Sequence, residues 1–91
     1  MVPITLEIYV EDQCSSCDQA EALAAEAREW FPALRAVIHR LGPDISLPDG
    51  IVAVPAYVLE HRLIQYGTPE RRQIGQAILD AFIARLPQSQ A

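Results

Sequence analysis

Two cysteines separated by two residues, Cys14 and Cys17, constrain this chain more than any other feature, because a strand pattern changes into a helix pattern there. Before them, Leu6, Ile8 and Val10 alternate with more polar neighbours, which is typical of a strand. After them, apolar residues recur every three or four positions and predict the core-facing side of a helix: Ala20, Leu23, Ala24, Ala27, Trp30 and Phe31. We therefore expect Cys14 at or just before a helix N-terminus and Cys17 in the first turn.

A cysteine pair at a helix start suits disulfide exchange. The thiolate is the nucleophile in that reaction, and the free amides and dipole of a helix N-terminus favour an anion. We expect Cys14 to be the more exposed and to attack, while Cys17 points back toward the helix and resolves a mixed disulfide. Ser15 and Ser16 are candidate capping residues, and Ser16 with Gln19 fits a capping box.

The length and charge of the chain narrow the function classes. Its 91 residues predict one domain over residues 1–87, with a polar tail over 88–91. A net charge of −5, with seven arginines and no lysine, argues against a nucleic-acid or anionic-membrane surface. We expect neither a secretory signal nor a membrane span, and hence a cytoplasmic location. In a reducing compartment, so close a cysteine pair is more plausibly catalytic or metal-binding than structural.

The middle of the chain predicts a second strand followed by a loop. Residues 34–41 read as a strand parallel to the first, because a helical crossover separates the two. Glycine and proline residues occur at both ends of residues 42–50, and the stretch between them is too short for a full helix.

The remainder predicts a hairpin and a final helix. A third strand begins near Ala56, just after a proline, and a tight turn at Glu60 and His61 leads into a fourth strand over residues 62–66. Thr68 offers an N-cap and Pro69 a first helical position. Apolar residues then follow at helical spacing until Pro87 ends the helix: Ile74, Ala77, Ile78, Ala81, Phe82 and Leu86.

The order of these features resembles the thioredoxin and glutaredoxin superfamily. The resemblance is carried by Cys14-Ser15-Ser16-Cys17 between a strand and a helix, and by Val54-Pro55 leading into a hairpin and a final helix. It implies an α/β, thioredoxin-like fold with a four-stranded mixed sheet in the order β-α-β-(loop)-β-β-α, in which the helix between the second and third strands is reduced or missing. It also implies a cis bond before Pro55 and a position for Pro55 against the two sulfurs.

This sequence departs from the superfamily at several positions. Gln13 stands where thioredoxins have tryptophan, and Ile8 replaces their buried acid, so no proton relay through that acid is expected. The segment from Tyr66 to Pro69 lacks the Gly-Gly and acidic residues with which glutaredoxins hold glutathione.

The resemblance implies a thiol-disulfide oxidoreductase, without a cofactor, that exchanges disulfides with a protein or a small molecule. We expect it to work in the reducing direction with an upstream reductant. Gln13, Val54, Pro55 and Tyr57 are then candidate substrate contacts. Two other readings stay open. One is a pair of inert core thiols. The other is a non-catalytic binding or adaptor domain that either docks on a larger redox enzyme or holds a metal through the cysteine pair, with a dimer supplying the other ligands.

Acidic residues surround the predicted site. Glu11, Asp12 and Asp18 place negative charge beside the thiols, which opposes a thiolate. His39 and His61 are expected to lie away from Cys14, as packing or solvated residues.

Two helices on one side would leave the other face of the sheet open. Leu6, Ile8 and Val10 are expected to meet the helices, and Thr5, Glu7 and Tyr9 to face away. We expect Tyr9, with Val37 and either Tyr57 or Leu59, to form an apolar patch near Glu7 and His39. The loop over residues 42–50, a partner or a second copy would cover it, and the last of these makes a homodimer.

Overall fold

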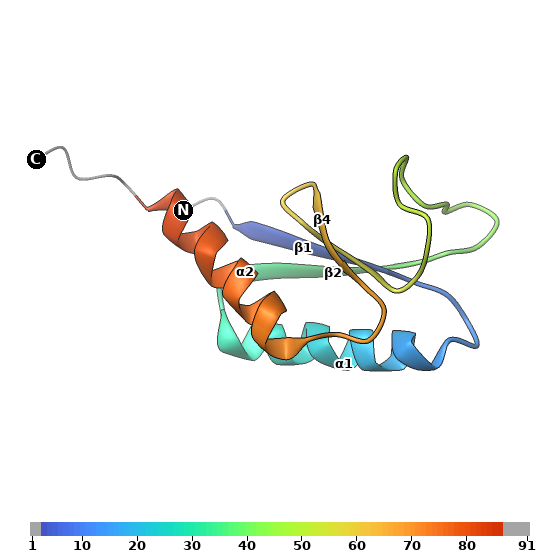
Figure 1. Cartoon of the computed structure of the whole chain (residues 1–91), viewed down its shortest axis with the longest axis horizontal. Coiled ribbons are helices and arrows are strands. Elements are labelled where there is room, and N and C mark those ends of the chain that lie inside the picture. The colour runs from blue at the N-terminus through green and yellow to red at the C-terminus, as the bar shows by residue number, and fades with distance from the viewer. Residues whose placement is uncertain (1–2, 87–91) are drawn as a thin grey trace, which may run out of the picture.

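The computed structural model describes residues 3–86, which form a small α/β domain with a four-stranded mixed sheet and two helices (Figure 1). The elements are β1 (Ile4–Val10), α1 (Ser15–Trp30), β2 (Leu34–Arg40), β3 (Ala56–Leu59), β4 (Arg62–Tyr66) and α2 (Arg71–Arg85). The predicted stop at Pro87 and the predicted tail lie outside the described residues. Within those residues, neither helix has the length and apolar character needed to cross a membrane.

The sheet has the strand order β2-β1-β3-β4. β1 pairs in parallel with β2 and antiparallel with β3, and β3 and β4 form the hairpin. The predicted parallel unit β1-α1-β2 is thus confirmed. So is the absence of a helix between β2 and β3, where residues 41–55 form a loop in which Gly42 and Ile45 exchange backbone hydrogen bonds.

The predicted hairpin turn forms without a glycine. Glu60 and His61 have φ values of 48° and 69°, a left-handed conformation that suits a two-residue hairpin. The carboxylate of Glu60 is anchored on both oxygens: one accepts the backbone N–H of Thr5 at 2.9 Å, and the other pairs with Arg85. These contacts to β1 and α2 tie the turn to the rest of the domain.

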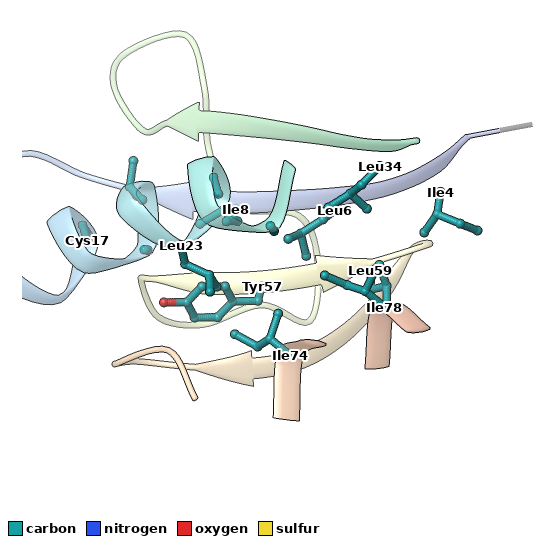
Figure 2. Packing of buried hydrophobic residues seen from close by; sticks show 14 residues of the cluster. Ile4, Leu6, Ile8, Cys17, Leu23, Leu34, Tyr57, Leu59, Ile74 and Ile78 are labelled. Atoms are coloured by element: carbon teal, nitrogen blue, oxygen red, sulfur yellow. The ribbon is translucent and has the colours of Figure 1, made fainter. Parts of the chain in front are cut away.

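The main core lies between the sheet and the two helices. Figure 2 shows Tyr57 of β3 among side chains from both helices, with Leu23 of α1 on one side and Ile74 of α2 on the other. Ile78 of α2 lies next to Leu59 in the same view. The buried members of this cluster are Ile4, Leu6, Ile8, Val10, Cys17, Ala20, Leu23, Ala24, Ala27, Leu34, Tyr57, Leu59, Ile74 and Ile78. The predicted inward faces of β1 and α1 are confirmed by this list, apart from the last two positions of the predicted helix face.

The opposite face of the sheet is covered by the long loop. Tyr9, Ala56 and Val58 form a second buried cluster, against which Leu41, Leu47, Ile51 and Val54 pack. Tyr9 is only 8% exposed, so the expected open patch around it is absent from the described residues.

The expectation that Tyr57 or Leu59 joins Tyr9 on that face was wrong. Tyr57 pairs with Ile8 and Leu59 with Leu6, so both point toward the helices. A homodimer through the face that Tyr9 occupies remains a prediction, now without an open surface around Tyr9 to support it.

Both helices begin differently from the sequence-based expectation. No side chain caps α1; Ser16, predicted to form a capping box with Gln19, instead makes a hydrogen bond to Thr68 at 3.4 Å between hydroxyl oxygens. α2 begins after Glu70 rather than at Pro69. The side chain of Gln65 explains this shift, because it donates to the carbonyl oxygen of Thr68 at 2.6 Å and accepts from the N–H of Glu70 at 3.3 Å.

The end of α1 also corrects an expectation. Phe31 is half-buried and stacks on Phe82 of α2, with 5.7 Å between ring centroids. Trp30, predicted to be a core residue, is 41% exposed. The apolar face of α1 therefore stops before Trp30.

Candidate functional site

Cys14 and Cys17 form a disulfide at the start of α1, with 5.2 Å between their Cα atoms. Cys14 is the N-cap residue, with extended backbone (φ −124°, ψ 108°), and Cys17 lies in the first turn. The N–H of Cys17 donates to the carbonyl oxygen of Cys14 at 3.1 Å. Cys17 is 1% exposed, whereas Cys14 is only partly buried. The predicted position and the predicted difference in exposure are both confirmed.

The loop before Cys14 is short and solvated. Glu11, Asp12 and Gln13 are all exposed, and Gln13 has a φ of 58°. The left-handed backbone of Gln13 turns the chain between β1 and α1, directly before Cys14.

Val54 and Pro55 lie at the same end of the sheet as this loop. Ala56 pairs with Tyr9, so Pro55 comes beside Val10, the residue from which the chain leads to Cys14. The Val54–Pro55 peptide bond is cis, as the resemblance implies. Pro55 is buried, and the partly buried Val54 packs against both apolar clusters. Register therefore brings the proline segment and the cysteine loop to one end of the sheet.

Tyr57 supports this segment from the core instead of lining a groove. Its side chain is fully buried, and its hydroxyl donates to the carbonyl oxygen of Gly67 at 2.8 Å. Gly67 in turn donates its N–H to the carbonyl oxygen of Pro55 at 2.9 Å. Burial raises the pKa of Tyr57 well above its ordinary value of 10.0, so the hydroxyl keeps its proton at alkaline pH values where an exposed tyrosine loses it. The structure thus places Tyr57 beneath the candidate site, away from solvent.

Arg40 is a feature of the site that the sequence analysis missed. Its guanidinium donates to Asp12 at 3.0 Å and to Glu21 of α1 at 2.8 Å. The hydrogen bond to Glu21, and then the one to Asp12, raise the pKa of Arg40. The parallel pairing of β1 with β2 could have indicated this contact, because it places Arg40 beside Val10, where the cysteine loop begins.

The charge around the disulfide is acidic but partly compensated. Glu11 and Asp18 are exposed, and no ion pair to either occurs within residues 3–86. Asp12, by contrast, shares Arg40 with Glu21. Two exposed carboxylates therefore oppose the favourable helix N-terminus at Cys14.

The histidines lie elsewhere. His39 contacts Glu7 at 2.8 Å and stacks on Tyr9, on the face of the sheet away from α1. His61 is exposed in the hairpin turn. In the part of the chain that the structure describes, no three His, Cys, Asp or Glu side chains gather as a metal site.

The fold and the site define a small α/β protein with a Cys-x-x-Cys disulfide at a helix N-terminus. A scan of protein-family models found none that matches the chain, and a search of curated proteins found none with significant similarity.

Proposed function

We propose that this protein is a thiol-disulfide oxidoreductase with a thioredoxin-like fold. The observation that carries the proposal is the unequal exposure of two bonded cysteines, with Cys14 partly exposed at a helix N-terminus and Cys17 buried one turn later. An attacking thiol has to reach a substrate, while a resolving thiol has to reach only the first sulfur. The mixed sheet and the cis proline directly before β3 also support the proposal.

In the proposed reaction, the reduced Cys14 thiolate attacks one sulfur of a substrate disulfide. The substrate S–S bond breaks, a Cys14–substrate disulfide forms, and the released thiolate takes up a proton. Cys17 then gives up its proton and attacks the Cys14 sulfur. The second substrate thiol leaves, the Cys14–Cys17 disulfide forms, and two electrons have passed to the substrate. An upstream thiol reductant restores the dithiol.

The residues beside the cysteines have separate proposed roles. Val54 presents its backbone to an extended substrate segment, and Pro55 fixes that backbone at the start of β3. Gln13 borders the approach to Cys14 because it is the exposed residue directly before it. Tyr57 acts indirectly, since its hydrogen bond to Gly67 supports the segment that carries Pro55.

The test is turnover of a protein disulfide with a thiol reductant, accompanied by metal analysis of the freshly purified protein. The proposal predicts catalysis that disappears in Cys14→Ser, and no stoichiometric zinc. Arg71→Gln is a suitable control, because Arg71 pairs with Glu26 on α1, away from the cysteines. Turnover that survives Cys14→Ser rejects the mechanism. Bound zinc without turnover instead supports the adaptor domain.

A further inference from the structure

α2 carries a second apolar face that the domain does not bury. Ile74 and Ile78 point into the core, but Leu79 and Ile83 lie on the other side of the helix, 41% and 54% exposed. They are one turn apart and form a short stripe along the helix. The C-terminal end of α1 lies beside α2 (Figure 1). Trp30, the last residue of α1, is exposed there and lines the same surface as Leu79.

Gly75 leaves a depression beside this stripe. A Cβ atom at Gly75 would lie 3.8 Å from the Trp30 ring, so the ring lies close beside the helix at this glycine. The depression has a volume of about 360 Å³, and Trp30, Gly75 and Leu79 contribute to its lining. Glycine inside a helix costs about 1 kcal/mol relative to alanine, so this opening carries a stability cost.

Charged residues of opposite sign flank the stripe. Arg72 precedes Leu79 by about two turns and lies on the same side of the helix, and Asp80 directly follows Leu79. Both are exposed and, together with Gln76, line one continuous strip of the α2 surface. Gln76 lies between them and donates to Asp80 at 2.8 Å. Positive charge near the start of the helix is therefore followed by negative charge on the same strip.

This order of charges is self-complementary. Consider a second α2 that packs antiparallel to the first, across a twofold axis. The strip from Arg72 to Asp80 then lies on the same side of the contact in both copies, and the two strips run in opposite directions. Arg72 of one copy then faces Asp80 of the other, twice per dimer. The same arrangement brings Leu79 of each copy over the depression at Gly75, so the apolar and the charged contacts agree on one partner.

We propose that a second copy of this chain binds antiparallel along α2, with Leu79 inserted over Gly75 and Arg72 paired with the other copy's Asp80. The surface is small compared with the roughly 20–30 residues per side of a stable interface, so the dimer is weak. It leaves Cys14 and Cys17 free, because they lie at the N-terminal end of α1 and Trp30 lies at the C-terminal end.

Sedimentation equilibrium up to millimolar concentration tests the association. We expect the average mass to rise above the 10.1 kDa of one chain toward twice that value. Leu79→Glu should hold the mass at one chain, and its helical circular dichroism should be unchanged because Leu79 is exposed. Trp30 is the only tryptophan, so its emission should shift to shorter wavelength as the wild type associates. A wild type that stays monomeric up to millimolar concentration overturns the proposal.

Charge exchange tests the antiparallel pairing. Arg72→Asp alone and Asp80→Arg alone each place like charges in contact, and we expect each to weaken association at least tenfold. The double variant restores opposite charges and should recover most of the wild-type affinity. Arg62→Asp on β4 is the control for net charge and should change the affinity less than threefold. Two single variants whose losses add in the double variant, with no recovery, would overturn this geometry.

Discussion

Cys17 donates its backbone N–H to the carbonyl oxygen of Cys14, and a disulfide joins the same two residues across the first turn of α1. The helix therefore positions Cys17 through its backbone and through its burial in the core. Cys14 is only partly buried, and residues 11–13 before it are exposed to solvent. This asymmetry assigns different tasks to two chemically identical side chains.

The charge around Cys14 predicts a reducing couple. Glu11 and Asp18 disfavour a thiolate, and a less stable reduced form lowers the reduction potential. We expect a value nearer about −270 mV than about −120 mV, which mark reducing and strongly oxidising members of the superfamily. Equilibration against a glutathione redox series measures it. A potential near the oxidising value would show that the helix N-terminus outweighs the carboxylates.

Neutralising one carboxylate should move this potential. Asp18→Asn removes a negative charge from the first turn of α1 and should raise the potential by on the order of 10 mV, since exposed charges are well screened. Glu29→Gln, an equally exposed change near the other end of α1, should leave it unaltered. Equal shifts in both variants would point to net charge rather than local charge.

Tyr57 should make the domain sensitive to alkaline pH. Burial raises the pKa of Tyr57 above 10.0, so near pH 10 the unfolded chain releases the phenolic proton while the folded chain keeps it. The free energy of unfolding therefore falls as the pH rises beyond about 10. Tyr57→Phe should lower stability at neutral pH by about 1 kcal/mol, through loss of the hydrogen bond to Gly67, and should make the alkaline decline shallower.

Urea unfolding across this pH range measures both effects. Tyr66→Phe is the control, because Tyr66 is an exposed tyrosine whose hydroxyl accepts the N–H of Val52. It should keep the wild-type decline. The pKa of Tyr9 is raised first by burial and then by Glu7. Because Tyr9 is present in every variant, some decrease of the free energy of unfolding with pH should remain in all of them. Parallel curves for Tyr57→Phe and the wild type would contradict the assigned role of Tyr57.

Gly67 is the glycine whose backbone conformation the site requires. Its φ of 83° is in the left-handed region, where a side chain costs roughly 1–2 kcal/mol. Gly67→Ala should reduce the free energy of unfolding by about that amount, although a Cβ atom there would meet no neighbour within 4 Å. Gly42→Ala, with equal space and without a positive φ, should change stability by less than about 0.5 kcal/mol. Equal losses at both positions would refute a conformational cause.

The order of elements could be predicted because each one carries its own local signal. Period two marks β1, period three to four marks α1 and α2, and the cysteine pair lies at the change between them. The parallel pairing of β1 with β2 follows from the length of the crossover. The order of the strands and helices can therefore be inferred from residues close together in the sequence and from the general rules for connecting strands.

The errors arise where distant segments decide the outcome. Which way Tyr57 points depends on the antiparallel register with Ile8, and neither strand contains that information alone. The start of α2 depends on Gln65, a strand residue whose side chain occupies the backbone groups on either side of Pro69. Leu41, Leu47 and Ile51 cover the sheet without any regular spacing, so no periodicity could reveal their contact with Tyr9.

Trapping a mixed disulfide shows which cysteine attacks a substrate. Reduced Cys17→Ala and Cys14→Ser are each mixed with an excess of a small aromatic disulfide, and intact mass is followed with time after circular dichroism has verified folding. We expect one adduct on Cys14 in the first variant, formed at least about tenfold faster than any adduct on the buried Cys17 in the second. Equal rates, or faster reaction at Cys17, would contradict the assignment of Cys14 as the attacking residue.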